Sequence, residues 1–256
     1  MCCGRSAVRA DSGPIRIPDW PLPKGVRSAF TLRYGGYSGG PYDSFNLGDH
    51  VGDDPEAVAK NRQHLVALLS LPREPQWLRQ VHGTELLQIC ADSPACADAA
   101  ADGAVTHAAG SVLAVLSADC LPVLACSRDG QHLGAFHAGW RGLLAGILEK
   151  GVAALEVPGE EVLIYLGPAI GPESFEVGPE LRAAFLAEDP GSESAFRPGQ
   201  GDRWWADIYQ LARQRLQRVG VTAIYGGDHC TFSDRDFFSY RRDGVTGRMA
   251  SLLWRE

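Results

Sequence analysis

Hydrophobic residues recur at helical spacing in three segments of the chain. In EAVAKNRQHLVALL the apolar positions that share one helical face are Val58, Leu65, Leu68 and Leu69. This spacing predicts an amphipathic helix, which Asp53 or Asp54 can cap and whose first turn suits Pro55. The same periodicity predicts helices over residues 140–155 and 205–220.

Continuous apolar runs bounded by turn residues predict buried strands elsewhere. They are VRSAFTL, LGAFHAG, EVLIYLG and the two halves of VLAVLSADCLPVLAC. Pro122 is incompatible with an uninterrupted central strand in the last of these runs, so a bend is predicted at Asp119-Cys120. QWLRQVHGTELLQIC predicts two strands broken at His82-Gly83, where glycine permits a tight turn.

The remaining segments complete the predicted architecture. The tail 237–254 predicts two strands joined by a loop, and residues 33–52 form a Gly-, Asp- and Ser-rich loop long enough to suggest a functional role. Strands and helices alternate irregularly, so we expect an α/β (α+β) fold with mixed sheets and helices on the outside. We expect one domain over residues 26–256, preceded by a loose extension over residues 1–25.

Composition and charge narrow the classes of protein that this chain can be. It has 256 residues, 45% hydrophobic content and a formal net charge of -7, with no cluster of basic residues, so we expect no nucleic-acid binding. No apolar run reaches the roughly 18 residues that span a bilayer, so we expect no membrane insertion. Seven cysteines without a disulfide framework favour a reducing compartment, and we expect a cytoplasmic monomer.

Three strong metal-binding side chains stand at breaks in apolar strands. They are His82 in QVHGTE, Cys120 in SADCLPV and His137 in FHAGWRG. Imidazole and thiolate together suit Zn²⁺, with copper as the alternative, and three protein ligands leave a tetrahedral ion one open position. That pattern is typical of a catalytic site.

The same residues allow two other interpretations. Their spacing does not match a zinc finger, and a buried cysteine and hydrogen-bonded core histidines would give the same pattern. Alternatively, Cys120 could be a nucleophile and His137 its base, with Asp119 or His82 orienting the imidazole. Sequence alone does not separate a metal ligand from a nucleophile, because both uses require a thiolate with a lowered pKa.

A series of longer motifs resembles one known family. They are RYGGYSGGPYDSFNLGDHVGDD followed by NR, then QVHGT, ADCLPVL, HAGWRG, GPAIGP and FFSYRRDGVTGRMA. From about Arg33 to the C-terminus the chain resembles the YfiH family, also called the laccase-domain or polyphenol-oxidase-like family. The resemblance implies an α/β/β/α layered sandwich similar to the catalytic domain of a deamidating toxin. It also implies a zinc ion held by His82, Cys120 and His137.

The resemblance further implies an enzyme whose partners are purine nucleosides and phosphate. The expected activities are phosphorolysis of adenosine, inosine, guanosine or methylthioadenosine, and deamination of adenosine. The alternative is a cysteine hydrolase that cleaves an amide bond in muramyl peptide precursors during peptidoglycan editing. A third hypothesis, a binding protein without catalysis, does not explain three metal ligands together with several loop arginines.

Nucleoside phosphorolysis requires further residues that hold phosphate and substrate. The guanidinium fork suits phosphate, and the candidates are Arg33, Arg62 and Arg141, each of which could instead be a solvated surface residue. Asn46 could contact sugar hydroxyls or close its own turn. Tyr240 and Arg241 could stack on or contact the base.

Two acidic residues are candidates for supporting roles in the site. Asp119 could handle a proton, and Glu85 could support the metal ligands or simply be exposed.

Multicopper oxidases use about ten histidines, largely as His-x-His pairs. This chain has seven histidines and no such pair, so we expect one mononuclear site.

Overall fold

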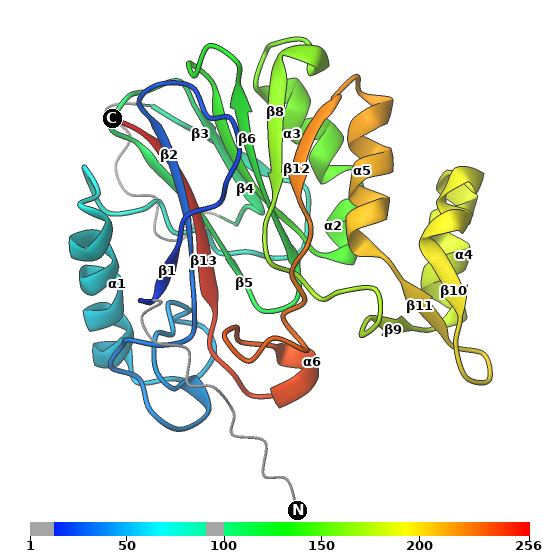
Figure 1. Cartoon of the computed structure of the whole chain (residues 1–256), viewed down its shortest axis with the longest axis horizontal. Helices are drawn as coiled ribbons and strands as arrows, with labels where there is room; N and C mark the ends of the chain where they lie inside the picture. Colours follow the sequence, from blue (N-terminus) through cyan, green and yellow to red (C-terminus); the bar gives the residue numbers. More distant parts are fainter. Residues whose placement is uncertain (1–12, 91–99) are drawn as a thin grey trace, which may run out of the picture.

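The computed structural model describes residues 13–90 and 100–256, in which two β-sheets pack face to face (Figure 1). The four-stranded antiparallel sheet has the order β1-β2-β13-β5. Its strands are β1 (Ile15–Arg16), β2 (Val26–Thr31), β5 (Val112–Ser117) and β13 (Met249–Arg255). The six-stranded sheet has the order β12-β8-β6-β7-β4-β3. Its strands are β3 (Leu86–Ile89), β4 (Gly103–Thr106), β6 (Leu121–Ser127), β7 (Leu133–Ala138), β8 (Val162–Leu166) and β12 (Ala223–Gly226).

The six-stranded sheet is mixed. β12 runs parallel to β8 and β3 runs parallel to β4, whereas the central pairs are antiparallel. A small third sheet, β10-β11-β9, lies beside α4. It consists of β9 (Glu176–Val177), β10 (Phe196–Pro198) and β11 (Trp204–Ala206).

The α-helices of the described residues lie outside the two packed sheets. They are α1 (Pro55–Leu69), α2 (Trp140–Leu144), α3 (Ile147–Ala154), α4 (Pro179–Glu188), α5 (Ile208–Arg218) and α6 (Tyr240–Asp243). Helix α1 packs on the four-stranded sheet, and α3 and α5 pack on the six-stranded sheet (Figure 1). Among the described residues no helix combines the length and apolar character needed to cross a membrane.

Alternating side chains of the central strands supply three apolar layers. In β5, Leu113 and Val115 face the space between the sheets, whereas Val112 and Ala114 face α1. All six residues of β5 are buried because helix and sheet cover both of its faces. The α/β/β/α layering implied by the resemblance is therefore present.

Several local predictions need correction. Residues 140–155 form two helices, because Gly146 adopts φ 91° between α2 and α3. Residues 76–81, predicted as a strand, contribute only isolated bridges at Gln76 and Arg79. The Gln80 side chain replaces main-chain pairing here, since its amide accepts from the N–H of Leu116 and donates to the carbonyl of Leu116.

The first half of the tail, predicted as a strand, instead forms a turn and the short helix α6. Ser239 caps α6 by accepting a hydrogen bond from Arg242 N–H. The Arg242 guanidinium then donates to the carbonyls of Thr231, Phe232, Asp234 and Phe237. These side-chain hydrogen bonds replace the strand pairing that the apolar pattern suggested.

The segment expected to be a loose extension is described from residue 13 onward and lies against the domain. Ile15 and Arg16 pair with β2, and the buried Trp20 donates its indole N–H to the Ser28 hydroxyl at 2.9 Å. Residues 1–12 of that segment, which include Cys2 and Cys3, lie outside the described residues.

One buried amide fixes the long loop over residues 33–52, which has no regular structure beyond a 3-10 turn at Gly40–Tyr42. The Asn61 side chain, on α1, is fully buried and bonds to the Ser38 hydroxyl, the carbonyls of Ser44 and Asn46, and the N–H of Tyr37. Helix α1 therefore holds the loop through Asn61.

Replacing Asn61 by alanine should destabilise the protein by about 3 kcal/mol, because several buried polar groups would lose their partner at once. Chemical denaturation measures this change. Gln63→Ala, at an exposed position of the same helix, should change the free energy of unfolding by less than about 0.5 kcal/mol. Equal effects of the two substitutions would contradict the anchoring role of Asn61.

Candidate metal centre

Three separate segments bring His82, Cys120 and His137 together. His137 lies on β7, and the residue that pairs with it across the ladder is Pro122 on β6. Cys120 immediately precedes β6 and therefore lies at the same end of these two strands. His82 lies in the turn before β3 and adopts φ 60°. The predicted bend at Asp119-Cys120 is confirmed, since β5 ends at Ser117 and β6 begins at Leu121.

The ligand atoms of these three residues all lie within 4.8 Å of one another. The Cys120 thiol lies 3.8 Å from His82 Nε2, and the two imidazole rings are 4.9 Å apart between centroids. His137 is buried, Cys120 is partly buried and His82 is exposed, so the group opens to solvent on the His82 side. Two imidazoles and a thiolate suit Zn²⁺ or copper.

The carboxylate of Asp102 orients both histidines. Asp102 is 0% exposed, and its Oδ1 lies 2.8 Å from His137 Nδ1, which leaves Nε2 of that ring to face the site. The same carboxylate accepts hydrogen bonds from the main-chain N–H groups of Val81, His82 and Gly83 at 3.1, 2.8 and 2.7 Å. It thereby holds the turn that carries His82 in its left-handed conformation.

The local electrostatics favour a thiolate at Cys120. Burial acts to raise the pKa of Cys120, but the adjacent His137 and His82 imidazoles outweigh it and lower that pKa to about 6. Burial acts to lower the pKa of His137, but Cys120 and Asp102 outweigh it and raise that pKa. Burial also opposes ionisation of Asp102, yet hydrogen bonds from His137 and Gly83 lower its pKa overall. A thiolate and a nearby carboxylate give the charge state that a divalent cation stabilises.

A glycine keeps the space beside the three donors open. A Cβ atom at Gly139 would lie 2.9 Å from His82 Cδ2 and 3.2 Å from the Cys120 sulfur. Its neighbour in the sequence, Trp140, begins α2, so the helix starts directly beside the site. The donor set and this open space together fit a single metal ion.

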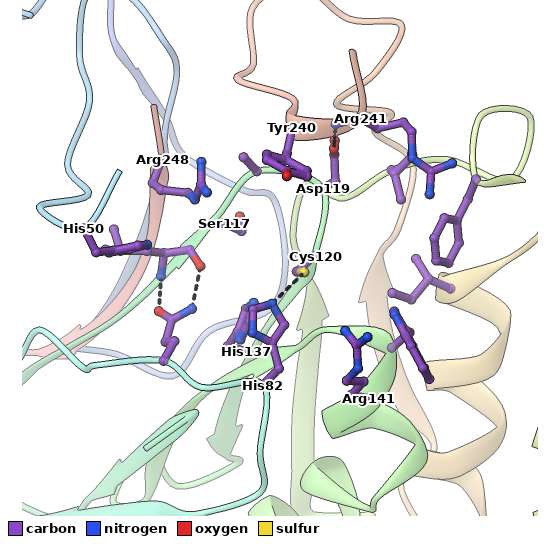
Figure 2. Close-up of a pocket in the computed structure, with 17 residues that line it drawn as sticks. His50, His82, Ser117, Asp119, Cys120, His137, Arg141, Tyr240, Arg241 and Arg248 are labelled. Carbon is purple, nitrogen blue, oxygen red and sulfur yellow. Dashed lines mark hydrogen bonds between the residues drawn. The ribbon is translucent and has the colours of Figure 1, made fainter. Parts of the chain in front are cut away.

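The three residues lie on the floor of a cavity of about 490 Å³ (Figure 2). Of the residues predicted from sequence, the cavity brings together His82, Asp119, Cys120, His137, Arg141, Tyr240 and Arg241. The other residues that line it are His50, Gln80, Leu116, Ser117, Ala118, Trp140, Ile170, Phe175, Ile208 and Arg248.

The Asp119 side chain joins two walls of this cavity. Asp119 adopts φ 93°, and its two carboxylate oxygens accept hydrogen bonds from the Thr231 hydroxyl and the Arg241 N–H, each at 2.6 Å. Arg241 in turn donates to the Glu176 carbonyl at 2.8 Å. The bend beside Cys120 is therefore tied to the start of α6.

Three residues predicted to bind substrate do not line the cavity. Arg33 donates to the Asp43 carbonyl and lies 3.7 Å from the Asp243 carboxylate. Arg62 donates to the Leu47 carbonyl, pairs with Asp49 at 3.2 Å and packs over the Trp77 ring. Asn46 is fully buried, where it closes its own turn at Gly48, bonds to Asp53 and accepts a hydrogen bond from Arg248 N–H.

Asp102, His50 and Arg248 are among the residues of the site that sequence reasoning missed. Asp102 is a single acidic residue before a strand and forms no motif with His82 or His137, so only the fold reveals their contact. Arg248 stands immediately before β13, and only the fold shows that it faces the cavity. Glu85, considered as a support for the ligands, is exposed and lies 4.0 Å from Lys150.

Comparisons with known proteins agree with this architecture. Residues 27–256 match the family described as multi-copper polyphenol oxidoreductase laccase. The purine nucleoside phosphorylase YfiH of Shigella flexneri is 52% identical over 239 residues, which cover 93% of this chain and 97% of that protein. A purine nucleoside phosphorylase of Pseudomonas aeruginosa is 51% identical, with 93% and 96% covered.

Solved structures of related proteins share the fold. The crystal structure of the Neisseria meningitidis protein NMB0706 superposes with a TM-score of 0.91 at 46% identity and covers 95% of this chain and 100% of that one. YlmD from Geobacillus stearothermophilus gives a TM-score of 0.84 at 31% identity, with 91% and 93% covered. These matches span nearly the whole chain and confirm the resemblance seen in its motifs, so the chain belongs to the YfiH family of laccase-domain proteins.

Proposed function

We propose that this protein is a purine nucleoside phosphorylase that uses one zinc ion at His82, Cys120 and His137 and also deaminates adenosine. The observation that carries the proposal is the convergence of three metal-binding groups on the floor of a cavity large enough for a nucleoside. The names of relatives about 50% identical over nearly the whole chain support the substrate class.

The lining of the cavity suits a nucleoside and an anion. Trp140, Ile170, Phe175 and Ile208 offer apolar surface for a purine ring. Arg141, Arg241 and Arg248 line the same cavity and offer positive charge to phosphate. A site that combines flat apolar surface with guanidinium groups matches both substrates of phosphorolysis.

In phosphorolysis a phosphate oxygen bonds to the anomeric carbon of ribose while the bond from that carbon to the base nitrogen breaks. The electron pair of that bond leaves with the base, which takes up a proton. The contribution of this chain is to hold both reactants in line within one cavity. His82, Cys120 and His137 would hold a divalent cation, which would supply Lewis acidity when bound.

Asp119 has a positioning role in this proposal. Both of its carboxylate oxygens already accept hydrogen bonds from Thr231 and Arg241. It therefore orients the turn that carries Tyr240 and Arg241, whose side chains face the cavity. Tyr240 is 62% exposed, which leaves its ring free to cover a bound nucleoside.

His82→Ala and Cys120→Ala should each remove bound zinc and reduce phosphate-dependent release of free base by about 100-fold or more, because the Lewis acid is lost. Metal analysis and a nucleoside panel assayed with and without phosphate measure both effects. Inosine formed from adenosine without phosphate reports deamination in the same panel.

His107→Gln is the matched control, since His107 is exposed and does not line the cavity. It should retain metal and activity. Base release that persists in both ligand variants after zinc removal would refute the proposal. Covalent trapping of Cys120 by an amide substrate in metal-free protein would instead favour the cysteine hydrolase.

Asp102→Asn should lower zinc affinity by about 10- to 100-fold, because the amide cannot match the carboxylate as a partner for His137 and for three main-chain N–H groups. Competition with a chelator measures this affinity. Asp129→Asn, in the turn at the opposite end of the β6–β7 hairpin from Cys120 and His137, should leave it unchanged. Wild-type affinity in Asp102→Asn would contradict an orienting role.

A further inference from the structure

Arg248 is a cation without an acidic partner at the wall of the cavity. Its guanidinium is partly buried and donates from Nη1 to the carbonyls of Thr246 and Gly247, each at 3.0 Å. In the described part of the chain no carboxylate forms an ion pair with it within 4 Å, and the acidic groups Cys120 and Asp119 act on its charge from a greater distance. A partly buried guanidinium is costly to leave unpaired, so this arrangement favours an anionic ligand.

The fold holds Arg248 in place from two sides. Its main-chain N–H donates to Asn46 Oδ1 at 2.8 Å, and Asn46 is itself fixed by Asn61. The loop at Gly48 packs closely on its stem, since a Cβ there would lie 2.8 Å from Arg248 Cγ. A preorganised guanidinium loses little entropy when it binds an anion.

Charge around the cavity is opposite to that of the whole protein. The chain carries a formal net charge of -7, yet its cavity is lined by three arginines, Arg141, Arg241 and Arg248, and by one acidic residue, Asp119. Both Asp119 oxygens are already engaged. Such local concentration of positive charge attracts anions into the cavity.

The cations lie on two different walls. Figure 2 shows Arg248 and His50 on one side of Cys120, with Arg141 and Arg241 on the other. Arg141 lies over the Trp140 ring at 4.4 Å and Arg241 lies 5.7 Å from the centre of the Phe175 ring. The second wall therefore combines its arginines with the Trp140 and Phe175 rings. The first wall, called the polar wall below, carries His50 and Arg248, and the Arg248 guanidinium lies 6.0 Å from the centre of the Tyr240 ring.

His50 completes the polar wall. Burial and then the neighbouring Arg248 charge lower the pKa of His50 below its usual value. The imidazole is therefore mainly neutral at pH 7 and has a single N–H. Its Nδ1 lies 3.5 Å from Asp49 Oδ1, so His50 can donate to an anion from Nε2 in the tautomer that leaves Nδ1 unprotonated.

We propose that Arg248 and His50 form the phosphate subsite, and that the aromatic wall at Trp140 and Phe175 receives the purine. This proposal rests on the proposed function. It assigns phosphate and purine to opposite sides of the metal-binding group. The expected ligand is inorganic phosphate, with its oxygens facing the Arg248 guanidinium. The metal-binding group at Cys120 lies between the phosphate subsite and the purine subsite. Arg33 and Arg62, which contact carboxylates and carbonyls outside the cavity, have no place in this subsite.

Steady-state kinetics of Arg248→Met test the subsite. The KM for phosphate should rise by about 10- to 100-fold through loss of a charge-assisted contact, while the KM for inosine changes by less than about threefold. Arg248→Lys should recover part of the phosphate affinity. Partial recovery by the conservative variant is a pattern that general damage to the fold would not produce.

Arg141→Met provides the comparison from the opposite wall and should raise the KM for inosine more than that for phosphate. Arg128→Met, on an exposed turn that does not line the cavity, is the distal control. An unchanged phosphate KM in Arg248→Met, or a larger increase in Arg141→Met, would overturn the assignment.

Calorimetric titration of inorganic phosphate into zinc-loaded protein separates this assignment from the proposed function. If the wild type releases no base but binds phosphate, and Arg248→Met loses that binding, the anion subsite stands and the phosphorylase proposal fails. If the wild type is a phosphorylase and Arg248→Met binds phosphate normally, the subsite proposal fails alone.

Discussion

A single buried carboxylate sets the geometry on which the candidate metal centre depends. Asp102 contacts His137 through its ring nitrogen and His82 through the main chain of its turn, so one group determines how two ligands from distant parts of the chain face each other. A carboxylate in an apolar sandwich requires this many donors to remain charged. The stability of the buried ion and the orientation of the ligands therefore depend on the same four hydrogen bonds.

The layered architecture explains why a site can form here. Two sheets buried on both faces give rigid strand ends, and the break between β5 and β6 places Cys120 beside β7 at one of those ends. The turns that complete the cavity come from the segment before β3 and from α6. Function is thus located on loops, while the sandwich supplies their fixed positions.

Much of this arrangement could be predicted from sequence, and the failures have physical causes. The apolar runs predicted the main strands, and Pro122 predicted the bend at Cys120, because both signals are local. Asp102 and Arg248 gave no such signal, since their roles arise from groups brought together by folding. The residues before α6 were predicted as a strand because their apolar pattern carries no information about the hydrogen bonds that the Arg242 side chain makes to nearby carbonyls. Arg33 and Arg62 were plausible anion ligands by residue type, but the fold places other acceptors beside them.

The Arg242 side chain has a mechanical consequence for the cavity. It ties the segment from Thr231 to Phe237 to the start of α6. Asp119 links Thr231 and the Arg241 N–H of α6 to the bend beside Cys120. Tyr240 and the Cys120 thiol consequently belong to one hydrogen-bonded unit, so a displacement of either is transmitted to the other. The ordering entropy of this wall is lost when the chain folds, and a ligand that enters the cavity does not have to supply it again.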